Sequence, residues 1–163
     1  MRLSKRWGEH GRRVLRSSQH RYVVVSVTYF IVANPLLEVT ARLAIGKQDL
    51  LPAIGETLYL AMVWPLTPLV LGLPFWGLGT IAAKVGRRSS PRMAVVALVS
   101  GVIMLTALYC FGHLGAQESV AHRRWTDAAL LIGLLPLLSV PVLIVVHLLG
   151  LVLVGVHAGL GER

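Results

Sequence analysis

Four long stretches of this chain carry no charged residue. Asp, Glu, Lys and Arg are absent from residues 22–37, 57–83, 93–117 and 128–161. A helix needs about 20 apolar residues to cross a hydrocarbon core of about 30 Å. The last three stretches meet that length, and the first meets it only if its helix continues through Glu38 and Arg42. The pattern therefore predicts transmembrane helices at about 22–45, 57–83, 93–115 and 134–158.

The same stretches favour helices over β-strands. Lipid cannot hydrogen-bond to the backbone, so only helices and closed barrels cross it. Barrel strands alternate polar and apolar residues, whereas residues 142–146 and 148–154 contain no such alternation. We expect an all-α integral membrane protein, a bundle of four transmembrane helices over residues 22–163, preceded by a basic cytoplasmic tail over residues 1–21.

Prolines interrupt two of the predicted spans. Pro65, Pro68 and Pro74 lie in the second, and Pro136 and Pro141 lie in the fourth. A proline removes one backbone hydrogen bond and bends a helix, which predicts kinks in both spans. The fourth uncharged stretch would extend roughly 50 Å as one helix, so we expect residues 128–135 to lie along the membrane interface before a bend.

Composition and charge agree with a membrane protein and predict its orientation. Hydrophobic residues make up 55% of the chain and charged residues 14%, against about 25% charged in soluble domains. Of the 16 Lys and Arg residues, twelve fall in the tail, the connection after the second span and the C-terminus. Basic residues gather on the cytoplasmic side of a membrane, so we expect a bacterial inner-membrane protein with both termini in the cytoplasm.

The basic segments also suggest what the protein contacts. Leu3, Trp7, Val14 and Leu15 lie near one helical face among arginines, which is typical of a helix lying on anionic lipid; a solvated tail is the alternative. Basic residues separated by apolar spans do not form a nucleic-acid-binding face, and we expect no nucleic acid. The residues expected to contact anionic lipid headgroups are Arg12, Arg13, Arg16, Lys84, Arg87 and Arg88.

Three polar residues share one face of the first predicted helix. Asn34, Glu38 and Arg42 are spaced four apart, so they form a stripe. Ionisable residues inside a membrane are functional candidates. With Thr67 and Ser139 at similar depth, they suggest a polar crevice open to the outside. The alternative is that Glu38 and Arg42 pair at the outer interface only to be tolerated there.

His147 is a further candidate, in the inner half of the fourth span. Haem would need two histidines at matching depth on different spans, and no second span offers a partner for His147. We expect a buried side chain bonded to a neighbouring helix, with a proton relay as the alternative. Metal-ligand clusters are missing from the sequence and Cys110 is the single cysteine, so we expect no metal and no cofactor.

The connections between the predicted spans, about 11, 9 and 18 residues long, leave no room for a soluble catalytic domain. We therefore expect a protein that acts by protein–protein interaction rather than as an enzyme. It would be an accessory subunit of a membrane complex or an immunity-type protein, bound to another membrane protein or to a second copy. The alternative is a small transporter or channel component with a polar path near Asn34, Glu38 and Arg42.

Overall fold

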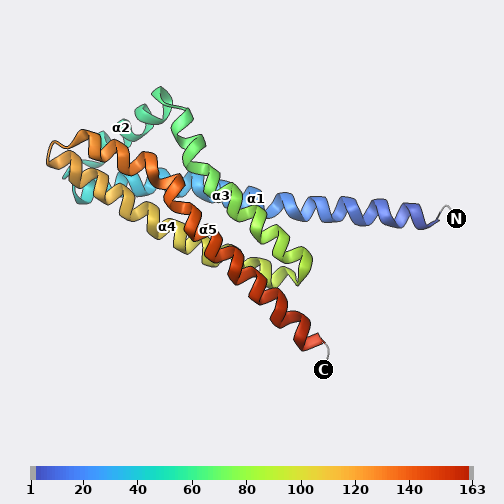
Figure 1. Cartoon of the computed structure of the whole chain (residues 1–163). Coiled ribbons are helices and arrows are strands. Elements are labelled where there is room, and N and C mark those ends of the chain that lie inside the picture. The colour runs from blue at the N-terminus through green and yellow to red at the C-terminus, as the bar shows by residue number, and fades with distance from the viewer. Residues whose placement is uncertain (1–2, 162–163) are drawn as a thin grey trace.

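Five α-helices account for almost all of the described chain. The structure, a computed structural model, describes the backbone of residues 3–161 and the side chains of residues 20–156. The helices are α1 (Leu3–Ala44), α2 (Leu50–Val63), α3 (Leu66–Arg88), α4 (Pro91–Ala121) and α5 (Trp125–Gly161) (Figure 1). No strand occurs among these residues, which confirms the predicted all-helical class.

Four helical segments are long and apolar enough to cross a membrane. They are His20–Ala44 within α1, all of α3 and α4, and Trp125–Val156 within α5. The first continues through Glu38 and Arg42, as the length argument requires. Four membrane-spanning helices are therefore supported by the structure.

The second span begins later than predicted. Residues 57–63 belong to α2, the helix is interrupted at Trp64 and Pro65, and α3 begins at Leu66. A residue that precedes proline is disfavoured in the helical conformation, and Trp64 has φ −121° and ψ 64°. The expected continuous helix over residues 57–83 is therefore wrong at its start, and α2 is a separate helix of 14 residues.

The start of α5 also differs from the prediction. Residues 128–135 are part of one continuous helix that includes Pro136 and Pro141, rather than a separate interfacial segment. They pack on α4, because Gly112 leaves room for the Leu135 side chain: a Cβ atom on Gly112 would lie 2.5 Å from Leu135 Cδ2. Contact with α4 therefore holds this segment against the other helices as part of α5.

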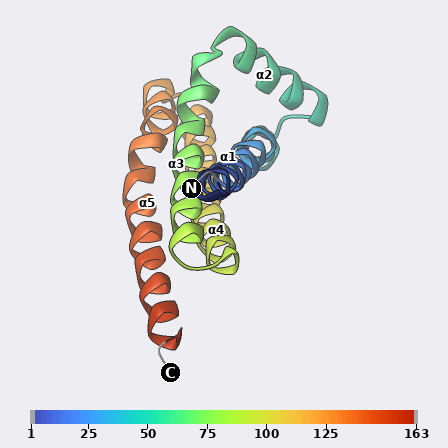
Figure 2. The ribbon, with the colours of Figure 1, turned by 90° about the vertical axis from the view of Figure 1, so that its right-hand side faces the viewer.

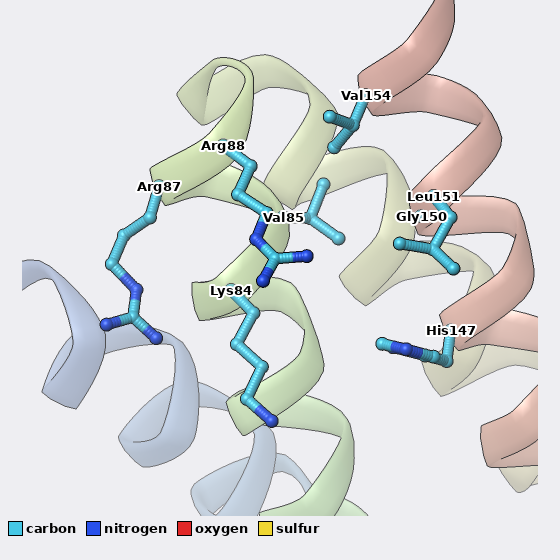
Figure 3. Close-up of a pocket in the computed structure, with 8 residues that line it drawn as sticks. All are labelled: Lys84, Val85, Arg87, Arg88, His147, Gly150, Leu151 and Val154. Carbon is cyan, nitrogen blue, oxygen red and sulfur yellow. The ribbon is translucent and has the colours of Figure 1, made fainter.

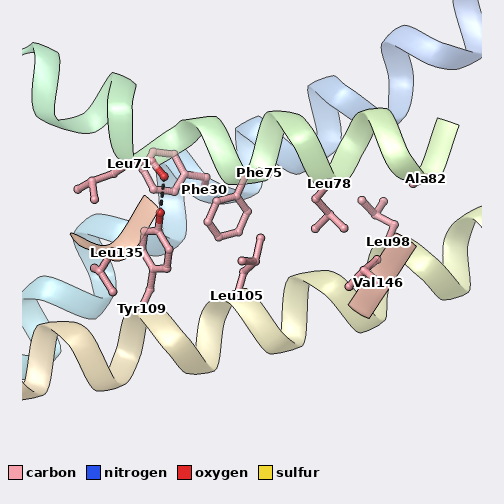
Figure 4. Close-up of a cluster of buried hydrophobic side chains, with 10 residues drawn as sticks. All are labelled: Phe30, Leu71, Phe75, Leu78, Ala82, Leu98, Leu105, Tyr109, Leu135 and Val146. Carbon is pink, nitrogen blue, oxygen red and sulfur yellow. Dashed lines mark hydrogen bonds between the residues drawn. The ribbon is translucent and has the colours of Figure 1, made fainter. Parts of the chain in front are cut away.

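Helix α3 lies at the centre of the packing, in contact with α1, α4 and α5 (Figure 2). The core is built around Phe30, Phe75 and Tyr109 (Figure 4). The ring of Phe75 lies 5.1 Å from that of Phe30 and 5.4 Å from that of Tyr109, between centroids. Lipid tails are as apolar as these side chains, so the hydrophobic effect does not bring helices together inside a membrane. Close packing of aromatic rings such as these helps to hold the helices together instead.

Two hydrogen bonds to the α3 backbone complete this core. The Tyr109 hydroxyl donates to the Leu71 carbonyl at 2.6 Å (Figure 4). The Ser26 hydroxyl donates to the Phe75 carbonyl at 2.7 Å. Polar side chains of α1 and α4 thus both bond to α3, which ties three helices together.

The two ends of the molecule differ. Helix α2 and the loop over residues 122–124 lie at one end, here called the α2 end, and the turn at Ser89 and Ser90 lies at the opposite, terminal end (Figure 1). Helix α1 continues in one line beyond the other helices at the terminal end. The predicted lipid contacts of Arg12, Arg13 and Arg16 lie outside the described side chains.

Candidate functional site

The candidate site is a network of charged side chains at the α2 end, centred on Arg42. Its Nη2 and Nε donate to Glu38 Oε1, at 2.9 and 3.3 Å, within α1. Its Nη1 donates to Glu56 Oε2 on α2. The Arg42 side chain is 9% exposed, against 20% for Glu38 and 53% for Glu56. One guanidinium therefore joins two helices through two carboxylates.

Local structure explains why these groups meet. Arg42 lies in the last turn of α1, where the helix dipole favours a cation. A short loop, with Lys47 in the left-handed region at φ 50°, then returns the chain so that α2 packs on α1. Gln48 in this loop donates from Nε2 to Glu56 Oε2 at 3.2 Å. The turn thus places Glu56 opposite Arg42.

A second polar pair lies beside the network. His113 Nε2 donates to Asn34 Oδ1 at 3.0 Å, and both side chains are buried between α4 and α1. Arg42 is close enough to His113 for the two to interact electrostatically. The structure therefore places Asn34, Glu38 and Arg42 in one polar region, with Asn34 bonded to α4 and Arg42 bonded to α2.

Three residues of this region are not among the candidate functional residues predicted from the sequence. Glu56 is the one charged residue within α2, and His113 is the one histidine within α4. Those two signals could have identified them as partners for Arg42 and Asn34. Nothing in the local sequence distinguishes Gln48 from other loop residues.

Two oxygen atoms in the region have no hydrogen-bond partner in the described part of the chain. They are Thr57 Oγ1 and Gln48 Oε1, both shielded from solvent. Thr57 follows Glu56 on α2, and Gln48 bonds Glu56 through its amide nitrogen. Buried polar atoms normally find a partner, so these oxygens offer hydrogen-bonding capacity to a water molecule or a polar ligand.

Two other expected members of the crevice lie elsewhere. Thr67 is exposed near the start of α3, where it lines a cavity of about 210 Å³ with residues of α3 and α5. Ser139 is buried, but its hydroxyl donates to the Leu135 carbonyl of its own helix at 2.7 Å. The expectation that Thr67 and Ser139 line a polar crevice with Arg42 is therefore wrong, because neither residue joins the Arg42 network. Towards the terminal end, the interior is filled by the apolar core around Phe75 and Leu105.

His147 is exposed rather than buried, so the expected buried bond to a neighbouring helix is wrong. Val146 takes the interior position on this turn of α5 and is fully buried. The next residue is rotated by about 100° around a helix axis, which carries His147 out of the core. There it lines a cavity of about 530 Å³ together with Lys84, Arg87 and Arg88 (Figure 3).

No protein-family model matches this chain, and no curated protein or solved structure matches it either. No group of three or more His, Cys, Asp or Glu side chains suited to a metal ion occurs among the described residues. Function must therefore be argued from the geometry of the described residues.

Proposed function

We propose that this protein acts by binding another membrane protein, as an accessory subunit of a membrane complex or as an immunity-type protein. The contact surface is α2, and the observation that carries the proposal is the exposure of this apolar helix. The polar side chains beside α2, which are Arg42, Glu38 and Gln48, form hydrogen bonds within the chain. We therefore assign them the role of holding α2 in place.

Apart from Glu56 and the buried Thr57, helix α2 consists almost entirely of apolar residues. Leu51 is 82% exposed and Met62 is 78% exposed. Within the described chain α2 packs mainly on α1. At 14 residues it is too short to span a membrane, and a helix that is apolar all round belongs in a buried setting. Another molecule must therefore cover it.

The setting of this surface favours a protein partner. Asp49, Gln48 and Glu56 form a polar edge along an exposed apolar patch, which is typical of interaction sites. The Arg42 bridge holds α2 in one orientation, and a pre-organised surface loses less conformational freedom on binding. We infer that the partner presents an apolar helix with a basic residue that faces the half-exposed Glu56 carboxylate.

Site-specific photo-crosslinking in native membranes tests this proposal. A photoreactive residue is placed at Leu51 or Met62 on α2, and at the exposed α4 positions Val99 or Ile103 as controls. We expect one discrete protein adduct from α2 and lipid adducts from α4. The captured protein is then identified and purified, and we expect Arg42→Gln to bind it more weakly than the wild-type chain.

Two outcomes would overturn the proposal. Lipid adducts from all four positions would mean that α2 is an interfacial helix covered by the bilayer. Adducts that contain only two copies of this chain would replace the separate partner with a homo-oligomer.

We further propose that the protein lies in a bacterial inner membrane with both termini in the cytoplasm. Lys84, Arg87, Arg88 and Arg92 lie around the turn at the terminal end. At the α2 end, by contrast, Glu56, Asp49, Glu118 and Asp127 offset the basic residues. This asymmetry supports the assignment of the terminal end to the cytoplasm.

A small transporter or channel component is the second candidate function. The observation that favours it is the pair of unpartnered oxygens, Thr57 Oγ1 and Gln48 Oε1, beside two carboxylates that share one guanidinium. In proteoliposomes, Glu38→Gln should abolish cation or proton flux. Glu118→Gln, at the same end and exposed, should leave it unchanged. Wild-type flux in Glu38→Gln would refute this role.

A further inference from the structure

A basic crevice opens between α3 and α5 near the terminal end. It has a volume of about 530 Å³, and its charged lining comes from Lys84, Arg87 and Arg88 on α3, with His147 on α5 (Figure 3). It lies at the opposite end of the molecule from the Arg42 network, so it is independent of the function proposed for α2.

Three side chains project into or along the gap between the two helices. Lys84 and Arg88 are four residues apart, so they lie on one face of α3. In Figure 3 the guanidinium of Arg88 extends towards α5, and the ring of His147 projects from α5 towards α3. Arg87 extends towards α1 instead. The gap is therefore flanked by two cations and an imidazole from two different helices.

The remaining wall of the crevice is apolar. It is formed by Val85, Gly150, Leu151 and Val154. Gly150 brings α5 against α3, because a Cβ atom at this position would lie 2.5 Å from Val85 Cγ2. Leu151 is exposed beside the crevice on the outer surface of α5. An occupant could thus have a polar group near the cations and hydrocarbon along α5.

The eight residues that line the crevice include no acid. Lys84 and Arg88 therefore face the gap without a carboxylate among its walls. Ammonium and guanidinium groups bind phosphate oxygens through short, charge-assisted hydrogen bonds, and imidazole can donate one more. Basic pockets between transmembrane helices on the cytoplasmic side are typical sites for anionic headgroups.

We propose that this crevice binds one anionic phospholipid, with its phosphate between Lys84, Arg88 and His147 and an acyl chain along Leu151 and Val154. The apolar wall distinguishes this ligand from free phosphate, because a soluble anion would leave that surface uncovered. A lipid in this position would also fill the space between α3 and α5 at the terminal end.

Lipid titration of the purified full chain in mild detergent tests the site, with native mass spectrometry as the readout. The probes are phosphatidylglycerol, phosphatidylcholine and soluble glycerol 3-phosphate. We expect saturable binding of one phosphatidylglycerol, much weaker binding of phosphatidylcholine, and no competition from glycerol phosphate. Equal binding of the two lipids would overturn the proposal. Full competition by glycerol phosphate would replace the lipid with a free phosphate ligand.

Variants locate the binding within the molecule. Lys84→Gln/Arg88→Gln should weaken phosphatidylglycerol binding about 25-fold, since each cation near a membrane surface is worth about fivefold in affinity. Arg92→Gln/Arg123→Gln removes the same charge at exposed positions outside the crevice and should bind as the wild type does. An equal loss in both double variants would mean general surface attraction and would overturn the site.

A third variant keeps every charge. Val154→Trp adds bulk to the apolar wall from a partly exposed position on α5, where the larger side chain need not disturb the core. It should displace the lipid while the cations remain. Wild-type phosphatidylglycerol affinity in a folded Val154→Trp protein would contradict the proposed position of the acyl chain.

Discussion

Arg42 is a cation close to the end of a membrane helix, and its environment explains how it is accommodated there. Its guanidinium contacts Glu38 and Glu56 and is 9% exposed. A buried ion pair gains little net stability over an apolar replacement, but removing one partner leaves charge without compensation. The two ion pairs of Arg42 therefore matter less for the total stability of the protein than for the way α2 is attached to α1.

Arg42→Gln should lower the free energy of unfolding of the purified protein by about 2 to 3 kcal/mol, because it leaves Glu38 and Glu56 close together without a counter-charge. Arg42→Lys should lie between this variant and the wild type, since one ammonium cannot reproduce the planar fork of a guanidinium. Thermal unfolding in detergent measures both. An Arg42→Gln midpoint equal to that of Arg92→Gln, an exposed control, would contradict this account of the network.

The buried bond between Asn34 and His113 permits a direct energetic test. A double-mutant cycle of Asn34→Leu and His113→Phe should give a coupling energy of about 0.6 kcal/mol, and up to about 1.7, as found for hydrogen bonds between membrane helices. Unfolding equilibria of the four proteins supply the values. Additive effects, with no coupling, would show that the pair does not contribute as a unit.

Close contact of backbones sets the arrangement of α1 and α3. A Cβ atom on Gly79 would lie 2.5 Å from Val23 Cα and 2.9 Å from the Tyr22 carbonyl oxygen. Backbone atoms cannot rotate away as a flexible side chain can. The two helices are therefore held at a separation that only glycine permits at this position.

Gly79→Ala should destabilise the protein by about 1 to 3 kcal/mol, the usual cost of overpacking. Gly133→Ala provides the matched control on α5, because a Cβ atom there meets no neighbour within 4 Å. Alanine favours the helix over glycine by up to about 1 kcal/mol, so the control should be neutral or slightly more stable. Equal midpoints for the two variants in thermal unfolding would refute the close approach of α1 and α3.

Charge is distributed unevenly over the whole molecule, and this predicts which end faces the cytoplasm. In a Cys110→Ser background, which removes the only native thiol, single cysteines replace Arg92 at the terminal end and His122 at the α2 end. An impermeant maleimide should label His122→Cys in intact cells and Arg92→Cys only after the membrane is opened. The reverse pattern would invert the proposed orientation.

Much of the architecture could be predicted without a structure. The bilayer has a fixed thickness and satisfies no backbone group, so the length of each uncharged stretch is enough to identify the spans. The same reasoning failed at Trp64, where the apolar pattern continues but the helix does not. Apolarity alone cannot separate a short helix outside the core from the span that follows it.

The sequence by itself determined the helical class, the number of segments that could span a membrane and the charge difference between the two ends, because these depend on the composition and length of continuous stretches. Only the tertiary structure decided that Glu56 pairs with Arg42, that Asn34 meets His113, and that His147 leaves the core. Such contacts depend on the rotation of each helix about its axis and on its neighbours. The rotation and the neighbours of a helix are set by close packing at sites such as Gly79 and Gly112. These glycines lie far along the chain from many of the residues that the packing brings together.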